Sequence, residues 1–368
     1  MPQIVRKTGL DCLKILAILM VIFQHMLGGI ESFSTFTHNS PEYWLLWILR
    51  CFSKVNVNAF VLISAYFLTQ KEFSARHLFL NILEVWLYSI LSYIVVAIIN
   101  GEVQFVQLAK ALFPVLSNSY WFATCYIGLY MLSPLLNRFV HALSRRALLF
   151  AVFIAYIVCC IYPNFFYLTR DATGGGRTLV WFVVLYFAAA YIRLYVDEKS
   201  IKKRLCLICY VGCSTCVFAI KFACDNLAIL TGRTTIFESL GMVFFSNDSP
   251  IYFIASIALF LWMFTIKFDN NTRLKMLITR LSSHSYAVYL IHDGSLASYI
   301  WAAFAAVPFS GVTLALYILM LPLLIYLICS AIDSLRKRAF SCVEQKSIFI
   351  RWCKKCDTFV NSGIGRKG

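Results

Sequence analysis

Charged side chains are scarce in this chain, and acidic ones are the scarcest. Only 14% of the 368 residues are charged, and the 17 aspartates and glutamates are outnumbered by 33 lysines and arginines. Hydrophobic residues make up 61% of the chain, and the mean hydropathy is +0.76. A soluble domain typically carries about 25% charged residues. The composition therefore excludes an ordinary soluble domain and predicts an all-α integral membrane protein.

The sequence also lacks the short motifs of several enzyme classes. It contains no HExxH motif, no GxSxG elbow and no Walker phosphate loop, which argues against zinc proteases, α/β-hydrolases and P-loop nucleotidases. Cys206, Cys209, Cys213 and Cys216 fall inside one apolar segment at helical spacing, and a straight helix cannot wrap four thiolates around one ion. We therefore expect no bound metal. We also expect no nucleic-acid partner, because no soluble domain is present to carry a binding module.

Ten apolar segments are long enough to cross a bilayer as helices, for which about 20 residues are needed. With the N-terminus in the cytoplasm, 26 of the 33 basic residues fall on the cytoplasmic side and seven on the outer side. This bias predicts that both termini are cytoplasmic. The chain then divides into a membrane domain, residues 1–335, and a basic cytoplasmic tail, residues 336–368. The ten predicted spans are residues 12–30, 47–69, 78–99, 120–139, 147–165, 178–196, 205–223, 250–266, 284–305 and 313–333.

The basic excess on the cytoplasmic side has two explanations. Anionic lipid headgroups attract such loops and account for much of the charge. A phosphate-bearing ligand that binds from the cytoplasm is the more specific explanation.

The first apolar segment carries an ionisable residue at membrane depth, His25. Such residues are costly in a bilayer and indicate a functional site. Lys14 precedes His25 by eleven residues, which is about three helical turns and about 16 Å of helix, and the two side chains share nearly one face. Asp11 lies one turn before Lys14. These three residues predict a polar stripe that leads from the cytoplasm to a buried imidazole.

Further polar and aromatic residues are placed where they could share a cavity with His25. His292 lies near mid-depth in the ninth segment, although a hydrogen-bonded packing histidine is an equally simple interpretation. Trp121 and Tyr126 belong to an aromatic-rich segment that is either an interfacial belt or a stacking surface for a sugar ring. The second segment contributes three polar residues, Asn56, Asn58 and Ser64. Glu84, in the third segment, is expected to pair with a basic residue.

This arrangement suits acyl transfer. A neutral imidazole is a good general base near neutral pH and can take a proton from a hydroxyl group that attacks an activated acyl carbon. A cation at the cytoplasmic mouth, such as Lys14, can hold the phosphates of a nucleotide-like donor. The three turns between them match an extended donor whose reactive end reaches the base.

Four segments resemble the acyltransferase-3 family of membrane O-acyltransferases, which acylates bacterial surface glycans. They are Asp11 to Lys14 with His25, the helix from Val55 to Leu68, the stretch from Tyr120 to Pro134, and the stretch from Ser283 to His292. Three departures from the family pattern are Lys14 where arginine is more common, Phe79 where a second arginine is expected after Arg76, and Ala65 where glycine is usual.

The resemblance implies that His25 is the catalytic residue and that acyl-CoA, most commonly acetyl-CoA, is the donor. It also implies that Lys14, Asp11 and Arg76 contribute to donor binding. The acceptor is expected to be a cell-surface or lipid-linked carbohydrate, and the location the bacterial inner membrane, among membrane lipids and proteins of glycan biosynthesis.

We assign the acceptor cavity to Trp121, Tyr126, Ser285 and His292. A different class of function also fits a polytopic protein with buried histidine and aspartate: a transporter or flippase for a glycolipid or a small solute. Inverted repeats with broken helices would favour transport, and none is evident in the sequence. Consumption of acyl-CoA separates the two hypotheses.

Overall fold

Helices account for nearly all of the structure. The computed structural model describes residues 7–30, 36, 40–166, 173–268, 272–305, 311–344 and 347–363, and no β-strand occurs among them. The prediction of an all-α fold is therefore confirmed. The α-helices are α1 (Thr8–Gly29), α2 (Pro41–Ser53), α3 (Asn56–Leu68), α4 (Ala75–Asn100), α5 (Phe105–Leu112), α6 (Trp121–Ala142), α7 (Arg145–Tyr156), α8 (Tyr162–Phe166), α10 (Leu179–Tyr195), α11 (Lys203–Thr231), α12 (Thr234–Met242), α13 (Pro250–Phe264), α14 (Thr272–Ser282), α15 (Ser285–His292), α16 (Ala297–Ala305), α17 (Gly311–Glu344) and α18 (Ser347–Gly363).

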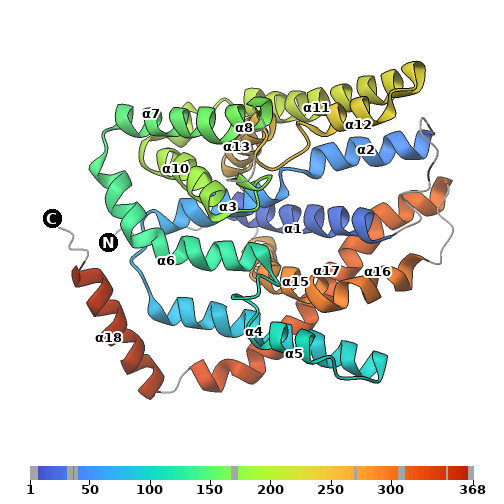
Figure 1. Ribbon diagram of the computed structural model, residues 1–368. Coiled ribbons are helices and arrows are strands. Elements are labelled where there is room, and N and C mark those ends of the chain that lie inside the picture. The colour runs from blue at the N-terminus through green and yellow to red at the C-terminus, as the bar shows by residue number, and fades with distance from the viewer. Residues whose placement is uncertain are drawn as a thin grey trace.

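Helix α1 lies at the centre of the bundle (Figure 1). It packs against α3 and α13 on one side and against α15 and α17 on the other, and it contributes residues to both hydrophobic clusters of the core. At Gly9 the approach to α13 is so close that a Cβ atom would collide with the carbonyl oxygen of Met263. A small residue lets two helix backbones meet in this way. The central position of α1 brings His25 within reach of several other helices.

Six stretches are long and apolar enough to cross a membrane, which agrees with an integral membrane protein. Two shorter apolar helices, α10 and α13, coincide with the sixth and eighth predicted spans. The structure does not confirm the count of ten or the orientation of the termini. The six long stretches are Thr8–Gly29, Pro41–Leu68, Ala75–Asn100, Arg145–Phe165, Lys203–Thr231 and Gly311–Phe340.

Two of the predicted spans are interrupted helices. The second span is divided into α2 and α3 by a turn at Lys54 and Val55. The ninth span is divided into α15 and α16 by a 3-10 turn over Gly294–Leu296, where Gly294 has a φ of +80°. A residue with side-chain bulk rarely adopts such a φ, so glycine is the residue that permits this break. Both interruptions put polar side chains beside the cavity described below.

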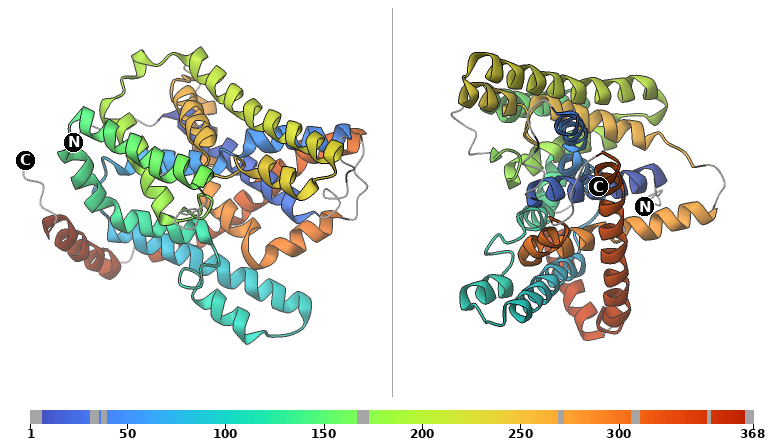
Figure 2. Two further views of the ribbon diagram at one scale, coloured as in Figure 1. Left: turned by 45° about the horizontal axis from the view of Figure 1, so that its top comes forward. Right: turned by 90° about the vertical axis from the view of Figure 1, so that its right-hand side faces the viewer.

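The seventh predicted span is one continuous helix, and a short helix lies between the third and fourth predicted spans. Residues 100–119 contain α5. Helix α11 is continuous from Lys203 to Thr231, so the four cysteines at positions 206, 209, 213 and 216 do lie along one helix. The two further views show α5 and α11–α12 on opposite sides of the bundle (Figure 2).

The predicted boundary between the membrane domain and the basic tail is at residue 335. That position lies inside α17, which continues to Glu344 without a break. The basic residues Arg336 and Lys337 therefore extend the last long helix. Residues 347–363 form α18, which packs against α4, and the backbone N–H of Ala75 donates a 2.5 Å hydrogen bond to Asp357 Oδ1.

Candidate functional site

A cavity of about 660 Å³ runs through the middle of the bundle; we call it the central cavity. Its walls come from α1, α3, α4, α6, α15 and α17 and from the turns beside them. These segments are far apart in sequence, so the cavity exists only once the helices have packed together. A pocket with both apolar walls and a few convergent polar groups is the usual form of a ligand site.

Five of the eight residues predicted for the site line the central cavity: Lys14, His25, Trp121, Tyr126 and Ser285. Lys14 and His25 face the same space, as their eleven-residue spacing predicted. Trp121 and Tyr126 come from α6 and Ser285 from α15, so three helices supply the set. The structure thus brings these residues together, and their individual roles stay predictions.

His292 lies directly behind His25. The two ring centroids are 5.1 Å apart, and His292 is fully buried. Its Nδ1 is 2.5 Å from the carbonyl oxygen of Val288. Because a carbonyl can only accept, this contact fixes the proton of a neutral ring on Nδ1 and leaves Nε2 as an acceptor. Nε2 has no hydrogen-bond partner among the described residues. The histidine pair therefore consists of one ring that lines the cavity and one fully buried ring with a free acceptor nitrogen.

Asp11 and Arg76 are placed outside the lining of the central cavity. The hydroxyl group of Ser282 donates a 3.0 Å hydrogen bond to Asp11 Oδ1, which ties α1 to α14. Arg76 is the second residue of α4, next to the contact with α18. The adjacent residue, His77, does line the cavity.

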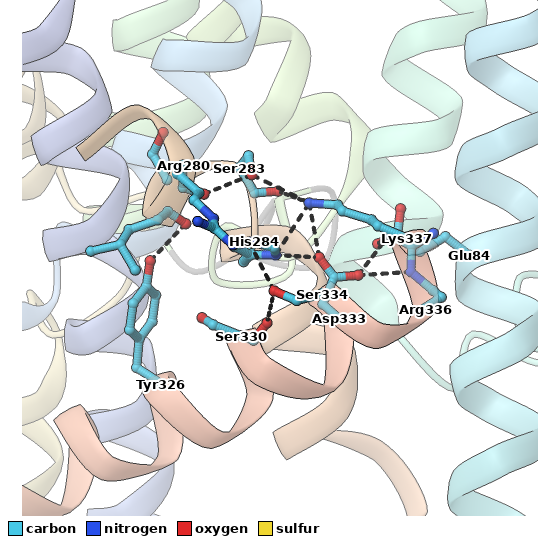
Figure 3. A network of polar contacts seen from close by, with 12 residues as sticks. Glu84, Arg280, Ser283, His284, Tyr326, Ser330, Asp333, Ser334, Arg336 and Lys337 are labelled. Atoms are coloured by element: carbon cyan, nitrogen blue, oxygen red, sulfur yellow. Dashed lines mark hydrogen bonds and ion pairs between the residues drawn. The ribbon is translucent and has the colours of Figure 1, made fainter. Parts of the chain in front are cut away.

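Charged side chains of α4 and α17 that line the central cavity belong to one network of polar contacts (Figure 3). Its centre is the fully buried Asp333, whose carboxylate lies 2.6 Å from His284 Nδ1, 2.7 Å from Arg336 and 2.9 Å from Lys337. Arg336 also pairs with Glu84 at 3.0 Å, which confirms that Glu84 has a basic partner. The network joins α4, α15 and α17.

Sequence reasoning missed most of this network. Asp333 ends the tenth apolar segment, and an acidic residue at such a position is a recognisable signal. Its partners could not be identified from the sequence, because Arg336 and Lys337 read as part of a basic tail. Their side chains face the cavity because α17 continues past residue 335.

Two of the three polar residues of the second segment line the cavity, and the third does not. Asn56 and Ser64 line the central cavity, as predicted. Asn58 does not: its side-chain amide donates to the carbonyl of Asn247 at 2.8 Å, and its Oδ1 accepts from the Trp181 indole at 2.9 Å. Its hydrogen-bonding groups are used to join α3 to α10 and to the turn before α13.

Aromatic rings form much of the cavity wall beyond His25. The ring centroids of Tyr126 and Tyr286 are 6.0 Å apart, and those of Phe122 and Tyr289 are 5.5 Å apart. The guanidinium group of Arg177 lies over the Trp121 ring at 5.8 Å. Flat apolar faces beside polar groups suit a ligand such as a sugar ring, which has both kinds of surface.

Comparison with known protein families assigns the chain to one of them. A family model described as an acyltransferase domain matches residues 7–332, which include every predicted site residue. The chain therefore belongs to the acyltransferase-3 family, and it is a membrane acyltransferase. No curated protein and no solved structure matches it.

Proposed function

We propose that this protein transfers an acyl group, most simply acetyl, from acyl-CoA to a hydroxyl group of a cell-surface or lipid-linked carbohydrate in the bacterial inner membrane. The observation that carries the proposal is the position of His25: it faces a cavity that also contains Lys14 three helical turns away and an aromatic wall on α6. No metal ion takes part in the proposed reaction.

In this proposal His25 acts as the general base. Its imidazole takes the proton of the acceptor hydroxyl, the hydroxyl oxygen forms an ester bond with the acyl carbon, and the carbon–sulfur bond of the donor breaks. The proton then passes from the imidazolium to the departing thiolate. His292 holds the ring of His25 in place from behind, at 5.1 Å. General acid–base catalysis of this kind contributes about 10²–10⁴-fold to a rate.

The end of the cavity near Lys14 fits the phosphate groups of the donor. Lys14, Arg336 and Lys337 line it, and the neighbouring carboxylates are Glu84 and Asp333. Lysine binds phosphate as a point charge without the two-pronged geometry of arginine. We therefore assign the phosphates to the Lys14 end and the acyl group to the His25 end, and the acceptor to the aromatic wall.

Release of free CoA tests the reaction class. The purified protein is incubated with acetyl-CoA and an extract of cell-envelope glycans, and both free thiol and the mass of the glycans are followed. We expect thiol release that depends on the extract, with acetylated glycans as products. A transporter or flippase would leave acetyl-CoA unchanged, and this outcome, repeated with longer acyl donors, would overturn the proposal.

A further inference from the structure

Three cationic side chains meet at the end of the central cavity that is remote from Lys14. They are Arg50, Lys54 and Arg177, and we call them the far-end cluster. Arg50 lies in the last turn of α2, Lys54 lies in the turn between α2 and α3, and Arg177 precedes α10. Lys54 interacts electrostatically with both arginines, so like charges are held close together there.

The surrounding structure fixes this cluster beside His25. The side-chain amide of Gln24, the residue before His25, donates a 2.8 Å hydrogen bond to the carbonyl oxygen of Arg50. The guanidinium group of Arg50 and the ammonium group of Lys54 both lie over the ring of Phe245, at 5.2 Å and 5.0 Å. Arg177 interacts electrostatically with His25 itself. The cluster is therefore a built part of the cavity wall at the level of the proposed base.

The two ends of the cavity differ in how their cations are compensated. At the Lys14 end, Arg336 and Lys337 form ion pairs with Asp333, at 2.7 Å and 2.9 Å. None of the three far-end cations forms an ion pair with any residue that the structure describes. Asp248 is within electrostatic range of Lys54, but its two oxygens accept hydrogen bonds from Thr173 and Ser246. Partly buried cations without an ion-pair partner are costly in free energy, and an anionic ligand would remove that cost.

A buried amide points to a ligand at the same place. Asn247 lines the cavity with 2% of its surface exposed, and its Oδ1 has no hydrogen-bond partner among the described residues. Its backbone is held on both sides, since its N–H donates to the carbonyl of Gly175 at 3.2 Å and its carbonyl accepts from Asn58 at 2.8 Å. Rotation of the amide by 180° presents an N–H donor instead. Such a group can bind the same anion as the cluster.

We propose that the far-end cluster binds an oxyanion carried by the acceptor, so that the acceptor is an acidic carbohydrate that bears a phosphate or a carboxylate group. This inference rests on the proposed function, because it assigns the donor phosphates to the Lys14 end. In acyl-CoA the phosphates and the thioester are at opposite ends, so a donor that enters from Lys14 brings no anion past His25. The anion at the far end then belongs to the acceptor. Arginine suits both phosphate and carboxylate oxygens, which it binds with two parallel hydrogen bonds.

Binding without turnover tests this inference. The protein is placed in phosphatidylcholine nanodiscs, which contain no anionic lipid, and titrated without acyl-CoA against inorganic pyrophosphate, glucuronate and glucose. We expect wild type to bind one or both anions and not glucose. The anion whose binding the far-end variants weaken identifies the source of the charge: pyrophosphate indicates a phosphate-bearing acceptor, and glucuronate a carboxylate-bearing one.

Variants locate the bound anion. Arg50→Gln, Lys54→Gln and Arg177→Gln should each weaken binding about tenfold or more, since each removes a charge-assisted hydrogen bond. Lys54→Arg retains the charge and should retain binding, which separates loss of charge from misfolding. Lys110→Gln removes an exposed cation outside the cavity and should bind like wild type.

Three results would overturn the inference: no binding of either anion by wild type, equal binding by the glutamine variants, or loss of binding in Lys14→Gln with the far-end variants unchanged. The last result would place the anion at the donor end. None of these readouts depends on catalysis. Failure of the inference is therefore distinguishable from failure of the proposed function, which is judged by thiol release.

Discussion

At the scale of single residues, the buried carboxylate of Asp333 is the clearest determinant of the structure around the cavity. It has no exposed surface and accepts from an imidazole, a guanidinium and an ammonium group. One carboxylate can compensate several donors inside a protein because the local dielectric is low. Removal of the charge would leave the cations of α17 and the ring of His284 without their common acceptor.

We predict that Asp333→Asn lowers the free energy of unfolding by about 3–5 kcal/mol, the usual cost of breaking a buried ion pair from one side. Thermal or chemical unfolding of the purified protein in detergent measures the change. Glu102→Gln is the matched control, since Glu102 is an exposed carboxylate, and it should stay within about 0.5 kcal/mol of wild type. An Asp333→Asn variant as stable as wild type would contradict this account of the network.

Residue-level prediction from the sequence succeeded where one helix carries the whole pattern. Lys14 and His25 share a face because eleven residues make three turns, and both line the cavity. Asp11, one turn earlier, faces α14 instead, because its orientation depends on which neighbour packs there. The convergence of the far-end cluster depends on three separate segments and could not be read from the sequence.

At the scale of elements, the break between α15 and α16 decides the shape of the cavity. It follows His292 directly, and Asp293 beside it lines the cavity. Gly294 has a left-handed φ, and a Cβ atom there would collide with the ring of Tyr120. Both the backbone conformation and the available space therefore require glycine.

We predict that Gly294→Ala lowers stability by more than Gly101→Ala does, and that it also lowers acyl transfer. Gly101 has a similar φ of +69° and open space around it, so alanine there adds backbone strain alone, about 1–2 kcal/mol. Unfolding in detergent and thiol release are measured on both variants. The difference between them separates the effect of the collision with Tyr120 from the effect of backbone strain. Equal losses in the two variants would show that the contact with Tyr120 is unimportant.

Element positions were largely predictable because apolar runs of about 20 residues are a strong signal. Each of the ten predicted spans falls on helix. The interruptions at Lys54 and at Gly294 were not predicted, because each lies inside a segment of membrane-spanning length that is apolar on both sides of the turn. A helix can break inside an apolar run when neighbouring elements satisfy its backbone groups, and only the packed structure shows where they do.

At the scale of the whole molecule, the positions of the N-terminal and C-terminal helices agree with the uneven distribution of lysine and arginine. The start of α1 and helix α18 lie at the same end of the bundle in Figure 1. Lys14 lies on α1 between that start and His25. The prediction that this side faces the cytoplasm rests on the distribution of lysine and arginine.

Reporter fusions test the orientation. Green fluorescent protein fused after Ser200 or at the C-terminus should fluoresce, and alkaline phosphatase fused after Gly232 should be active, because the first two sites are predicted to be cytoplasmic and the third external. Phosphatase activity at Ser200 together with inactivity at Gly232 would reverse the orientation. It would also place the Lys14 end, and the donor, on the wrong side of the membrane.

The central claim is that His25 is the general base of an acyl transfer, and replacement of this one residue tests it most directly. Turnover of acetyl-CoA is measured for wild type, His25→Ala and His141→Ala, with folding checked by gel filtration. His141 is an exposed histidine on α6 whose Nδ1 contacts the carbonyl of Asn137 at 2.8 Å, so it is the matched control. We predict that His25→Ala lowers turnover about 10²–10⁴-fold and that His141→Ala retains it. A folded His25→Ala variant with wild-type turnover would contradict the claim.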